Sequence, residues 1–429
     1  MKGFIWYLLF CFSGMIVFSE VNAQHRNVLI GAENDPEEVS ICINPKNPAL
    51  MVAGANIENY YFSSDSGKTW RGAKLESAYG VWGDPCIIVD TNNAFYFFHL
   101  SNPLSSGSWI DRIVCQKSIN NGINWTKGTY TGLNENKIQD KHWAAIDRKT
   151  NNLYVTWTQF DRYESSNRRD SSNIMFSSSE DEGKSWSKPI RINQKAGDCS
   201  DDDNTVEGAV PTIGPNSEIY VAWAGPEGIF FDRSTDHGKT WLKKDVFVSD
   251  MPEGWSIKIP GMYRCNGLPI TACDISNSQY KGTIYINWAD QRNGIDNTDI
   301  WLAKSTDNGN TWSKPIRVND DTTKRQQFLT WMAIDQTNGN LYFVFYDRRR
   351  FADERTDIYM ARSTDGGKTF TNFKISERPF IPNSATFMGD YTNVSVYNNI
   401  IRPIWTSMDR YKRLSVWTAI IDKEKIGKK

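Results

Sequence analysis

The sequence predicts an all-β fold, a seven-bladed β-propeller, and two observations carry this prediction. The first is a short pattern, Ser-x-Asp-x-Gly-x-Thr-Trp, which recurs at residues 63–70, 179–186, 234–241, 305–312 and 363–370, with a degenerate copy at 118–125. The second is that short runs of β-branched and aromatic residues flank every copy. Successive copies start 55 to 71 residues apart, a period that fits one four-stranded blade.

Each copy of the pattern is expected at a turn between two strands. In residues 305–312, the Asp307 carboxylate can accept hydrogen bonds from backbone N–H groups of its own turn. Gly309 supplies a backbone conformation that other residues resist, and Trp312 can pack between sheets. The pattern therefore indicates structural turns rather than catalytic groups.

Six sets of three strands precede the six copies. They are expected at 39–44, 50–55 and 60–63; 85–89, 94–100 and 113–117; 143–147, 153–159 and 174–178; 209–213, 219–223 and 229–233; 268–273, 283–288 and 300–304; and 329–335, 341–346 and 358–362. A seventh set without the pattern is expected at 391–396, 401–405 and 414–420. The N-terminal run 27–31 is similar to the outer strands at 189–193 and 315–319, so we expect it to complete the seventh blade and close the ring. A six-bladed ring with a C-terminal appendage is the alternative.

The repeated pattern resembles the Asp-box, or bacterial neuraminidase (BNR) repeat, of sialidases and sialidase-like secreted proteins, over nearly the whole mature chain. The resemblance implies a propeller but selects no reaction, because this box recurs in glycosidases, lyases and non-enzymatic receptors. Sialidases of this kind are six-bladed and carry a basic motif before the first box, which begins an arginine triad for the substrate carboxylate. The matching segment 37–41 reads Glu-Glu-Val-Ser-Ile, which argues against true sialidase activity.

The ends and the composition define the rest of the chain. Residues 1–23 combine a charged start, an apolar run and a small-residue cleavage site, so we expect a cleaved signal peptide, a secreted protein and a single propeller domain over 24–429. The net charge of −1 gives no basic surface for nucleic acid or anionic membrane. The mature chain has six cysteines, whose pairing the spacing does not determine. We expect a monomer that binds a glycan and needs no cofactor.

The candidate site lies on the propeller face opposite the repeated turns, where inner strands begin and second strands end. Polar residues gather at these positions. The catalytic candidates are Asp84, Asp140, His142, Glu207, Asp390 and Tyr391, and the substrate-binding candidates are Arg264, Asp290, Arg292, Trp331, Asp347 and Arg348.

Structural roles compete with these functional assignments. Asp84 and Asp390 can simply cap tight turns, and Asp290 with Arg292, or Asp347 with Arg348, can form ion pairs that tie blades together. The acidic run 201–203 can be a solvated loop or a structural Ca²⁺ site, although it lacks EF-hand spacing.

Three classes of function fit the candidate residues on this face of the propeller. A glycoside hydrolase needs one protonated carboxyl group and a second carboxylate, which these residues supply in excess. A polysaccharide lyase needs a base such as His142 or Tyr391 and a cation such as Arg264 or Arg292 beside a uronate carboxylate. A non-catalytic module would use tryptophans as stacking platforms. The excess of carboxylates over histidines favours the hydrolase.

Overall fold

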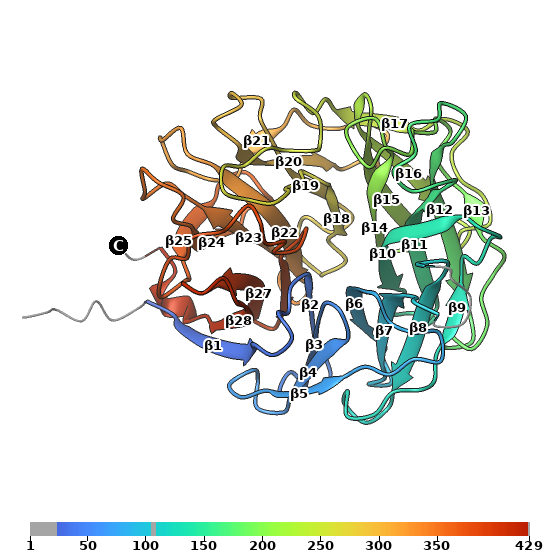
Figure 1. The fold of residues 1–429 in the computed structure, drawn as a ribbon, viewed down its shortest axis with the longest axis horizontal. Coiled ribbons are helices and arrows are strands. Elements are labelled where there is room, and N and C mark those ends of the chain that lie inside the picture. Colours follow the sequence, from blue (N-terminus) through green and yellow to red (C-terminus); the bar gives the residue numbers. More distant parts are fainter. Residues whose placement is uncertain (1–23, 104–108, 428–429) are drawn as a thin grey trace, which may run out of the picture.

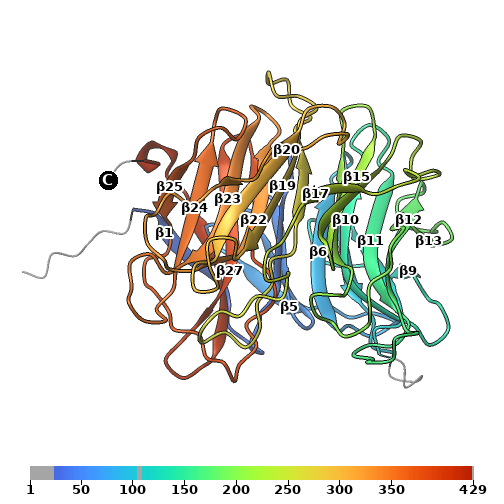
Figure 2. The ribbon, with the colours of Figure 1, turned by 90° about the horizontal axis from the view of Figure 1, so that it is seen from above.

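Seven four-stranded antiparallel sheets surround a central axis in the computed structural model, which describes residues 24–103 and 109–427 (Figure 1). Figure 2 shows the ring from the side, with the connecting loops gathered at two opposite ends. The predicted seven-bladed propeller is confirmed, and the six-bladed alternative is wrong. The signal peptide predicted for residues 1–23 lies outside the described residues.

Six blades use four consecutive strands each. Blade one contains β2 (Val39–Ile43), β3 (Met51–Ala55), β4 (Asn59–Ser63) and β5 (Arg71–Lys74). Blade two contains β6 (Gly83–Val89), β7 (Phe95–Leu100), β8 (Ile113–Ser118) and β9 (Thr129–Thr131). Blade three contains β10 (Ile138–Ile146), β11 (Leu153–Phe160), β12 (Ser172–Ser179) and β13 (Ile190–Arg191).

The same order continues in the second half of the chain. Blade four contains β14 (Glu207–Ile213), β15 (Ile219–Gly225), β16 (Gly228–Ser234) and β17 (Val246–Ser249). Blade five contains β18 (Ile270–Cys273), β19 (Ile284–Asp290), β20 (Asp299–Ser305) and β21 (Ile316–Arg317). Blade six contains β22 (Gln327–Asp335), β23 (Asn340–Asp347), β24 (Asp357–Ser363) and β25 (Thr371–Lys374).

The seventh blade joins the two ends of the described chain. It contains β26 (Asn393–Tyr397), β27 (Ile400–Met408) and β28 (Leu414–Ile420), and its outer strand is β1 (Arg26–Gly31). β1 pairs antiparallel with β28, so that Asn27 faces Ala419 (Figure 1). The predicted closure by the N-terminal strand is confirmed. A short 3-10 helix, Lys423–Lys425, follows β28.

The repeated turns are held by the contacts that the sequence predicts. Asp307 Oδ1 accepts the Thr311 N–H at 3.0 Å, and its Oδ2 accepts the Thr311 hydroxyl at 2.6 Å. The Gly309 N–H donates to Ser305 Oγ at 2.9 Å, and Gly309 has a φ of 81°. Trp312 packs edge-on against Phe231 of the preceding blade. Each turn therefore links its own sheet to a neighbour.

Asp307→Ala is expected to lower the free energy of unfolding by about 1–3 kcal/mol, because it leaves the Thr311 N–H and hydroxyl without their acceptor. Asp307→Asn is the matched control. In the degenerate turn, Asn120 Oδ1 accepts the Asn124 N–H at 2.9 Å, so an amide oxygen can serve the same place. Urea unfolding measures both variants, and an alanine variant as stable as wild type would contradict this role for the carboxylate.

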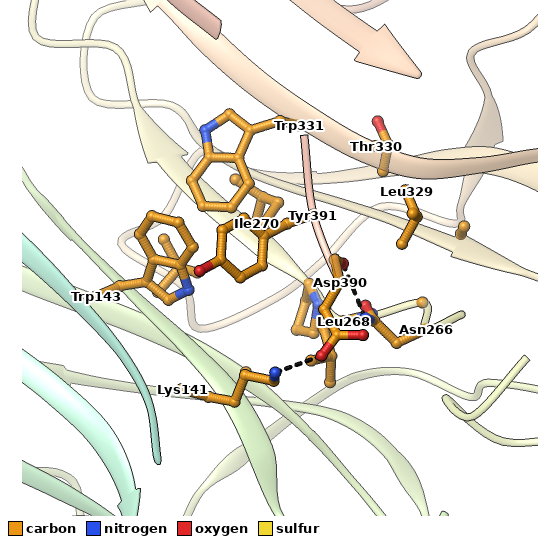
Figure 3. A pocket seen from close by; sticks show the side chains of 15 residues that line it. Lys141, Trp143, Asn266, Leu268, Ile270, Leu329, Thr330, Trp331, Asp390 and Tyr391 are labelled. Carbon is orange, nitrogen blue, oxygen red and sulfur yellow. Dashed lines mark hydrogen bonds and ion pairs between the residues drawn. The ribbon is translucent and has the colours of Figure 1, made fainter. Parts of the chain in front are cut away.

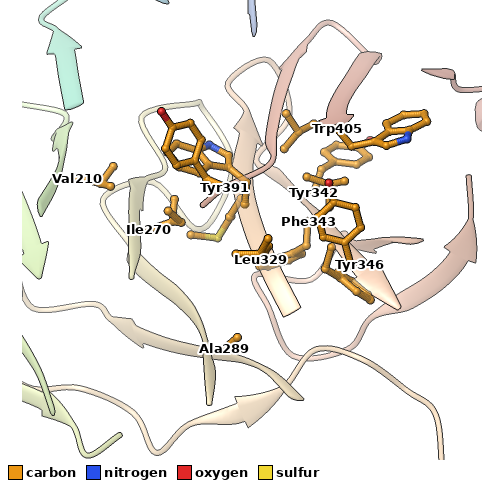
Figure 4. Close-up of a cluster of buried hydrophobic side chains, with 14 of the residues drawn as sticks. Val210, Ile270, Ala289, Leu329, Tyr342, Phe343, Tyr346, Tyr391 and Trp405 are labelled. Carbon is orange, nitrogen blue, oxygen red and sulfur yellow. The ribbon is translucent and has the colours of Figure 1, made fainter. Parts of the chain in front are cut away.

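The core continues from the inner strands into the space between blades. Figure 4 shows part of it, where Phe343 and Tyr346 of β23 and Trp405 of β27 are buried along with Leu329 of β22. Nearly every residue of β23 is buried, which explains why that segment is continuously apolar instead of alternating.

The six cysteines among the described residues are free thiols. Within that part of the chain, no helix has the length and apolar character needed to cross a bilayer.

Candidate functional site

Four inner strands are interrupted at the same place, and this irregularity builds the site. β6, β10, β14 and β22 each shift register near their first residues, which marks a β-bulge. The bulges contain Asp84, Lys141, Gly208 and Leu329, whose φ angles are 52°, 49°, 74° and 47°. Bulges re-aim side chains, and non-glycine residues with positive φ are uncommon. The bulges bring charged residues of neighbouring blades to one end of the channel.

These residues form a mostly buried group that we call the mouth cluster. Its members share the loop face opposite the repeated turns. They are Glu38, Asp84, Asp140, Lys141, Asp201, Glu207, Arg264 and Asp390.

Asp390 is the centre of the mouth cluster. Lys141 Nζ donates to Asp390 Oδ2 at 2.5 Å (Figure 3). Arg264 binds both carboxylate oxygens, at 2.9 and 2.6 Å. The Asn266 side chain donates to the backbone carbonyl of Asp390 at 2.9 Å, and the Asp390 N–H donates to Glu38 Oε1 at 3.2 Å. Asp390 thus connects residues of several blades, and both of its carboxylate oxygens accept hydrogen bonds from the side chains of Lys141 and Arg264.

The electrostatics of this centre are strongly coupled. Burial alone would raise the pKa of Asp390, but the charges of Lys141 and Arg264 lower it to about 2. Burial would in turn lower the pKa of Lys141, whereas Asp390, Asp84 and Glu38 raise it well above its usual value. Lys141 and Asp390 are therefore both ionised at neutral pH.

Two pairs of carboxyl groups interact beside Lys141. Burial followed by the Asp84 charge raises the pKa of Glu38 well above its usual value. Burial followed by the Asp201 charge raises the pKa of Glu207 in the same way. Neither Glu207 side-chain oxygen has a hydrogen-bond partner among the described residues, and the residue is 0% exposed. Burial therefore favours the protonated form of Glu207.

Asp140 lies beside these pairs. Its Oδ1 accepts the Lys141 N–H at 2.8 Å. Burial raises the pKa of Asp140 to about 6, against the charge of Lys141. This pKa lies below neutral pH, so the ionised form of Asp140 predominates there, whereas burial favours the protonated form of Glu207.

Asp140→Asn is expected to stabilise the protein at pH 8 by about 3 kcal/mol, since the pKa of Asp140 rises from 3.8 to about 6 on folding. Between these values the folded state binds more protons than the unfolded state, so the wild type loses stability as pH rises through about 6. Asn keeps the acceptor for the Lys141 N–H and does not ionise. Unfolding titrations at pH 4 and pH 8 measure the effect, which should vanish at pH 4. An equal difference at both pH values would contradict it.

An aromatic wall closes the channel beneath the mouth cluster. Tyr391 packs edge-on against Trp143 at 5.1 Å, and Trp143 lies 4.3 Å from Trp331 between ring centroids (Figure 3). The Tyr391 hydroxyl is buried without a partner, and burial followed by the Asp84 charge raises the pKa of Tyr391 well above its usual value. These rings, Lys141 and Asp390 line a cavity of about 30 Å³.

A second cavity lies beside Asp390 and has a volume of about 50 Å³. Lys141, Asp201, Glu207, Arg264 and Asp390 all line it. A space of this size holds a water molecule but no sugar ring, and its walls offer several polar partners for that water. A glycan would therefore lie on the solvent side, where 43% of the Arg264 side chain is exposed.

Several predicted site residues do not join the mouth cluster. His142 and His99 are both buried in the blade interior. Burial, followed by the His99 charge, lowers the pKa of His142 to about 3. Asp290 pairs with Arg292 at 2.5 Å, as the ion-pair alternative predicts, and Arg292 reaches Ser249 of the neighbouring blade.

The ion pair predicted between Asp347 and Arg348 is wrong. Asp347 Oδ1 accepts the Arg349 N–H at 2.7 Å, and this turn returns the Arg349 side chain to Asp347 Oδ2, also at 2.7 Å. Arg348 points inward instead, with its guanidinium 5.2 Å from the Phe328 ring centroid and its Nε donating to Thr356. Burial lowers the pKa of Arg348 to about 10.

Sequence reasoning missed Lys141 and Glu38 as members of the site. Both occupy the position five residues before the last residue of the inner strand, where Asp84 stands in blade two. Aligning the blades on that position reveals the charged series Glu38, Asp84 and Lys141, a signal that individual motifs do not give.

The residues of the acidic run 201–203 have separate hydrogen-bond partners. Asp201 accepts the Tyr163 hydroxyl at 2.6 Å, and Asp203 accepts the Ser256 N–H at 2.8 Å. Among the described residues, no group of three or more His, Cys, Asp or Glu side chains is arranged to hold a metal ion.

Comparison with known proteins gives the fold. No protein family matches the sequence, and no curated protein matches it either. A solved protein of unknown function from Dyadobacter fermentans DSM 18053 is 10% identical, with a TM-score of 0.51 over 92% of this chain and 98% of that chain. The NanB sialidase from Streptococcus pneumoniae is 9% identical, with a TM-score of 0.52 over 88% of this chain and 84% of that chain. A PL25 ulvan lyase is 12% identical, with a TM-score of 0.52 over 91% and 95%. The chain therefore has a sialidase-like propeller fold, which hosts more than one reaction.

Proposed function

We propose that this chain is a secreted, monomeric propeller that acts on carbohydrate as a glycoside hydrolase. One feature of the site carries the proposal: Glu207 and Asp140 are both buried in the mouth cluster, where burial raises the pKa of Glu207 well above its usual value and that of Asp140 to about 6. Hydrolysis of a glycosidic bond needs one carboxyl group held protonated as acid and another ionised. The fold shared with a sialidase and a polysaccharide lyase supports a carbohydrate as the substrate.

Each of these residues has a separate role in the proposed reaction. Glu207 is fully buried and lines the cavity of about 50 Å³, so it donates its proton through one water in that cavity to the glycosidic oxygen as the bond from the anomeric carbon breaks. Asp140 removes a proton from the water that adds to that carbon, which balances the proton that Glu207 gives up. Asp201 acts as a positioning residue, because its charge keeps the proton on Glu207. Lys141 holds Asp390 and shares its charge with the carboxylates around it.

The charge of the mouth favours neutral sugars over sialic acid. The six carboxyl groups of the mouth cluster face only two cations, and Arg264 is already bound to Asp390 through two hydrogen bonds. Glu38 is buried where the family resemblance would place a basic motif. A sugar carboxylate would meet these groups without a free arginine triad.

A lyase is the second candidate, and the unpartnered Tyr391 hydroxyl beside Lys141 favours it. In that reaction Tyr391 would remove the proton next to a uronate carboxyl group, with Arg264 neutralising the carboxylate. The raised pKa of Tyr391 disfavours its use as a base at neutral pH. A non-catalytic glycan-binding propeller is the third possibility.

A turnover screen separates these possibilities. Protein from Gln24 onward is incubated with sialylated glycans, neutral polysaccharides and uronate-containing polysaccharides, while new reducing ends and ultraviolet absorbance are followed together. Reducing ends alone are expected. Ultraviolet absorbance of an unsaturated product would establish a lyase instead, and glycan binding without either signal would establish a binding module.

A further inference from the structure

Aromatic side chains flank the mouth cluster on two sides. The first flank consists of Trp82, before β6, Trp109, between β7 and β8, and Tyr163, between β11 and β12. Trp82 lies 5.6 Å from Trp109, and Trp109 lies 5.5 Å from Tyr163, as edge-to-face contacts between ring centroids. Trp82 is 37% exposed. Three loops of two blades thus build one continuous aromatic surface.

The second flank consists of Tyr263, between β17 and β18, and Phe387, between β25 and β26. Their ring centroids are 6.0 Å apart, and Tyr263 is 60% exposed. Neighbouring aromatic rings that are exposed together can mark a ligand-binding surface. Both residues lie on the loop face that carries the mouth cluster, away from the repeated turns.

A line of contacts connects the two flanks across the mouth cluster. Tyr163 donates its hydroxyl proton to Asp201 at 2.6 Å, and Asp201 lies 4.0 Å from Arg264. The Arg264 guanidinium lies 4.5 Å from the Phe387 ring centroid. The hydrogen bond to Tyr163 leads directly to Asp201, the partner of Glu207. The flanks therefore extend the candidate site in two directions and do not form separate surfaces.

We infer that the mouth binds a glycan chain of several sugar residues, which lies across the mouth cluster with one part on the Trp82 flank and the other on the Tyr263 flank. This inference rests on the proposed function and names the class of substrate, an oligosaccharide or polysaccharide cut internally. Sugar rings pack their apolar faces on aromatic rings and keep their hydroxyls free for polar groups. A site for one terminal sugar would need no exposed aromatic rings on both sides.

The test compares chain lengths. Two-, four- and eight-residue fragments of the polysaccharides in the screen are titrated against the Glu207→Gln protein, which prevents cleavage during the measurement. Affinity is expected to rise with length. Trp82→Ala and Tyr263→Ala should each weaken binding of the eight-residue fragment about tenfold, with little effect on the two-residue fragment.

Tyr411→Ala is the matched control, because Tyr411 is 62% exposed on the β27–β28 turn and its side chain contacts Arg410 and Arg413. It should change neither affinity. Affinity independent of length, or equal losses in Tyr263→Ala and Tyr411→Ala, would overturn the inference. Cleavage by the wild-type protein is measured on the same fragments. Length-dependent binding without cleavage would support the extended glycan-binding surface and refute the hydrolase, and cleavage without length dependence would refute the extended surface and support the hydrolase.

Discussion

Glu207→Gln is expected to slow glycoside cleavage by about 10²–10⁴-fold while the propeller stays folded. Glu207 is fully buried, neither of its side-chain oxygens has a hydrogen-bond partner in the part of the chain that the structure describes, and the Asp201 charge raises its pKa further. Gln has nearly the same shape and can donate an N–H to Asp201, but it cannot give up a proton. The loss should therefore appear in kcat, with KM nearly unchanged. Initial rates measure it on the glycan that the screen identifies.

A change of leaving group distinguishes the acid from the base. An aryl glycoside with an acidic phenol leaves without much protonation, so Glu207→Gln should recover most of its rate on that substrate. Asp140→Asn should stay slow on both substrates, because activation of water is still required. If both variants responded alike to the leaving group, the division of roles between Glu207 and Asp140 would be wrong.

Lys141→Met is expected to lower the free energy of unfolding at neutral pH by about 3–5 kcal/mol, the usual cost of removing one partner from a buried ion pair. Lys141 contacts Asp390 at 2.5 Å and Glu38 at 3.8 Å, and both carboxylates are buried. Methionine fills a similar volume without the charge. The carboxylates of Asp390 and Asp84 would then face each other with Arg264 as the remaining cation of the mouth cluster.

Lys117→Met is the control for this variant. Lys117 pairs with Glu182 at 2.7 Å, but 20% and 40% of the two side chains are exposed, so its loss should cost less than about 1 kcal/mol. Lowering the pH toward 4 should reduce the defect of Lys141→Met, since the neighbouring carboxyl groups then bind protons. Denaturant unfolding at pH 4 and pH 7 measures both. A defect that does not depend on pH would mean that Lys141 acts through packing.

The repeated turns and the blade number were predictable because six of the seven blades contain the same short turn pattern after their third strand. The Asp307 turn, with its bonded Thr311 and its glycine at positive φ, recurs with little variation and can be read from eight residues. The N-terminal strand could be placed in the seventh blade because its sequence is similar to the outer strands, and a closed ring needs every edge paired.

The site was predictable in its position but only partly in its members. Asp390, Asp140, Glu207 and Arg264 do meet at the mouth. His142 could not be excluded from sequence because a one-residue offset at a β-bulge decides whether a side chain faces the channel or the blade interior. Lys141 was missed because its role depends on Asp390, which is 249 residues away in sequence.

The protonation state of Glu207 at neutral pH tests the account most directly. An infrared difference spectrum of wild type minus Glu207→Gln at pH 7 needs no substrate, and the other buried carboxyl groups cancel in it. We predict a band from one protonated carboxylic acid, because burial and the Asp201 charge raise the pKa of Glu207. A difference spectrum with only a carboxylate band would mean that Glu207 is ionised, and the proposed acid of the hydrolase would be refuted.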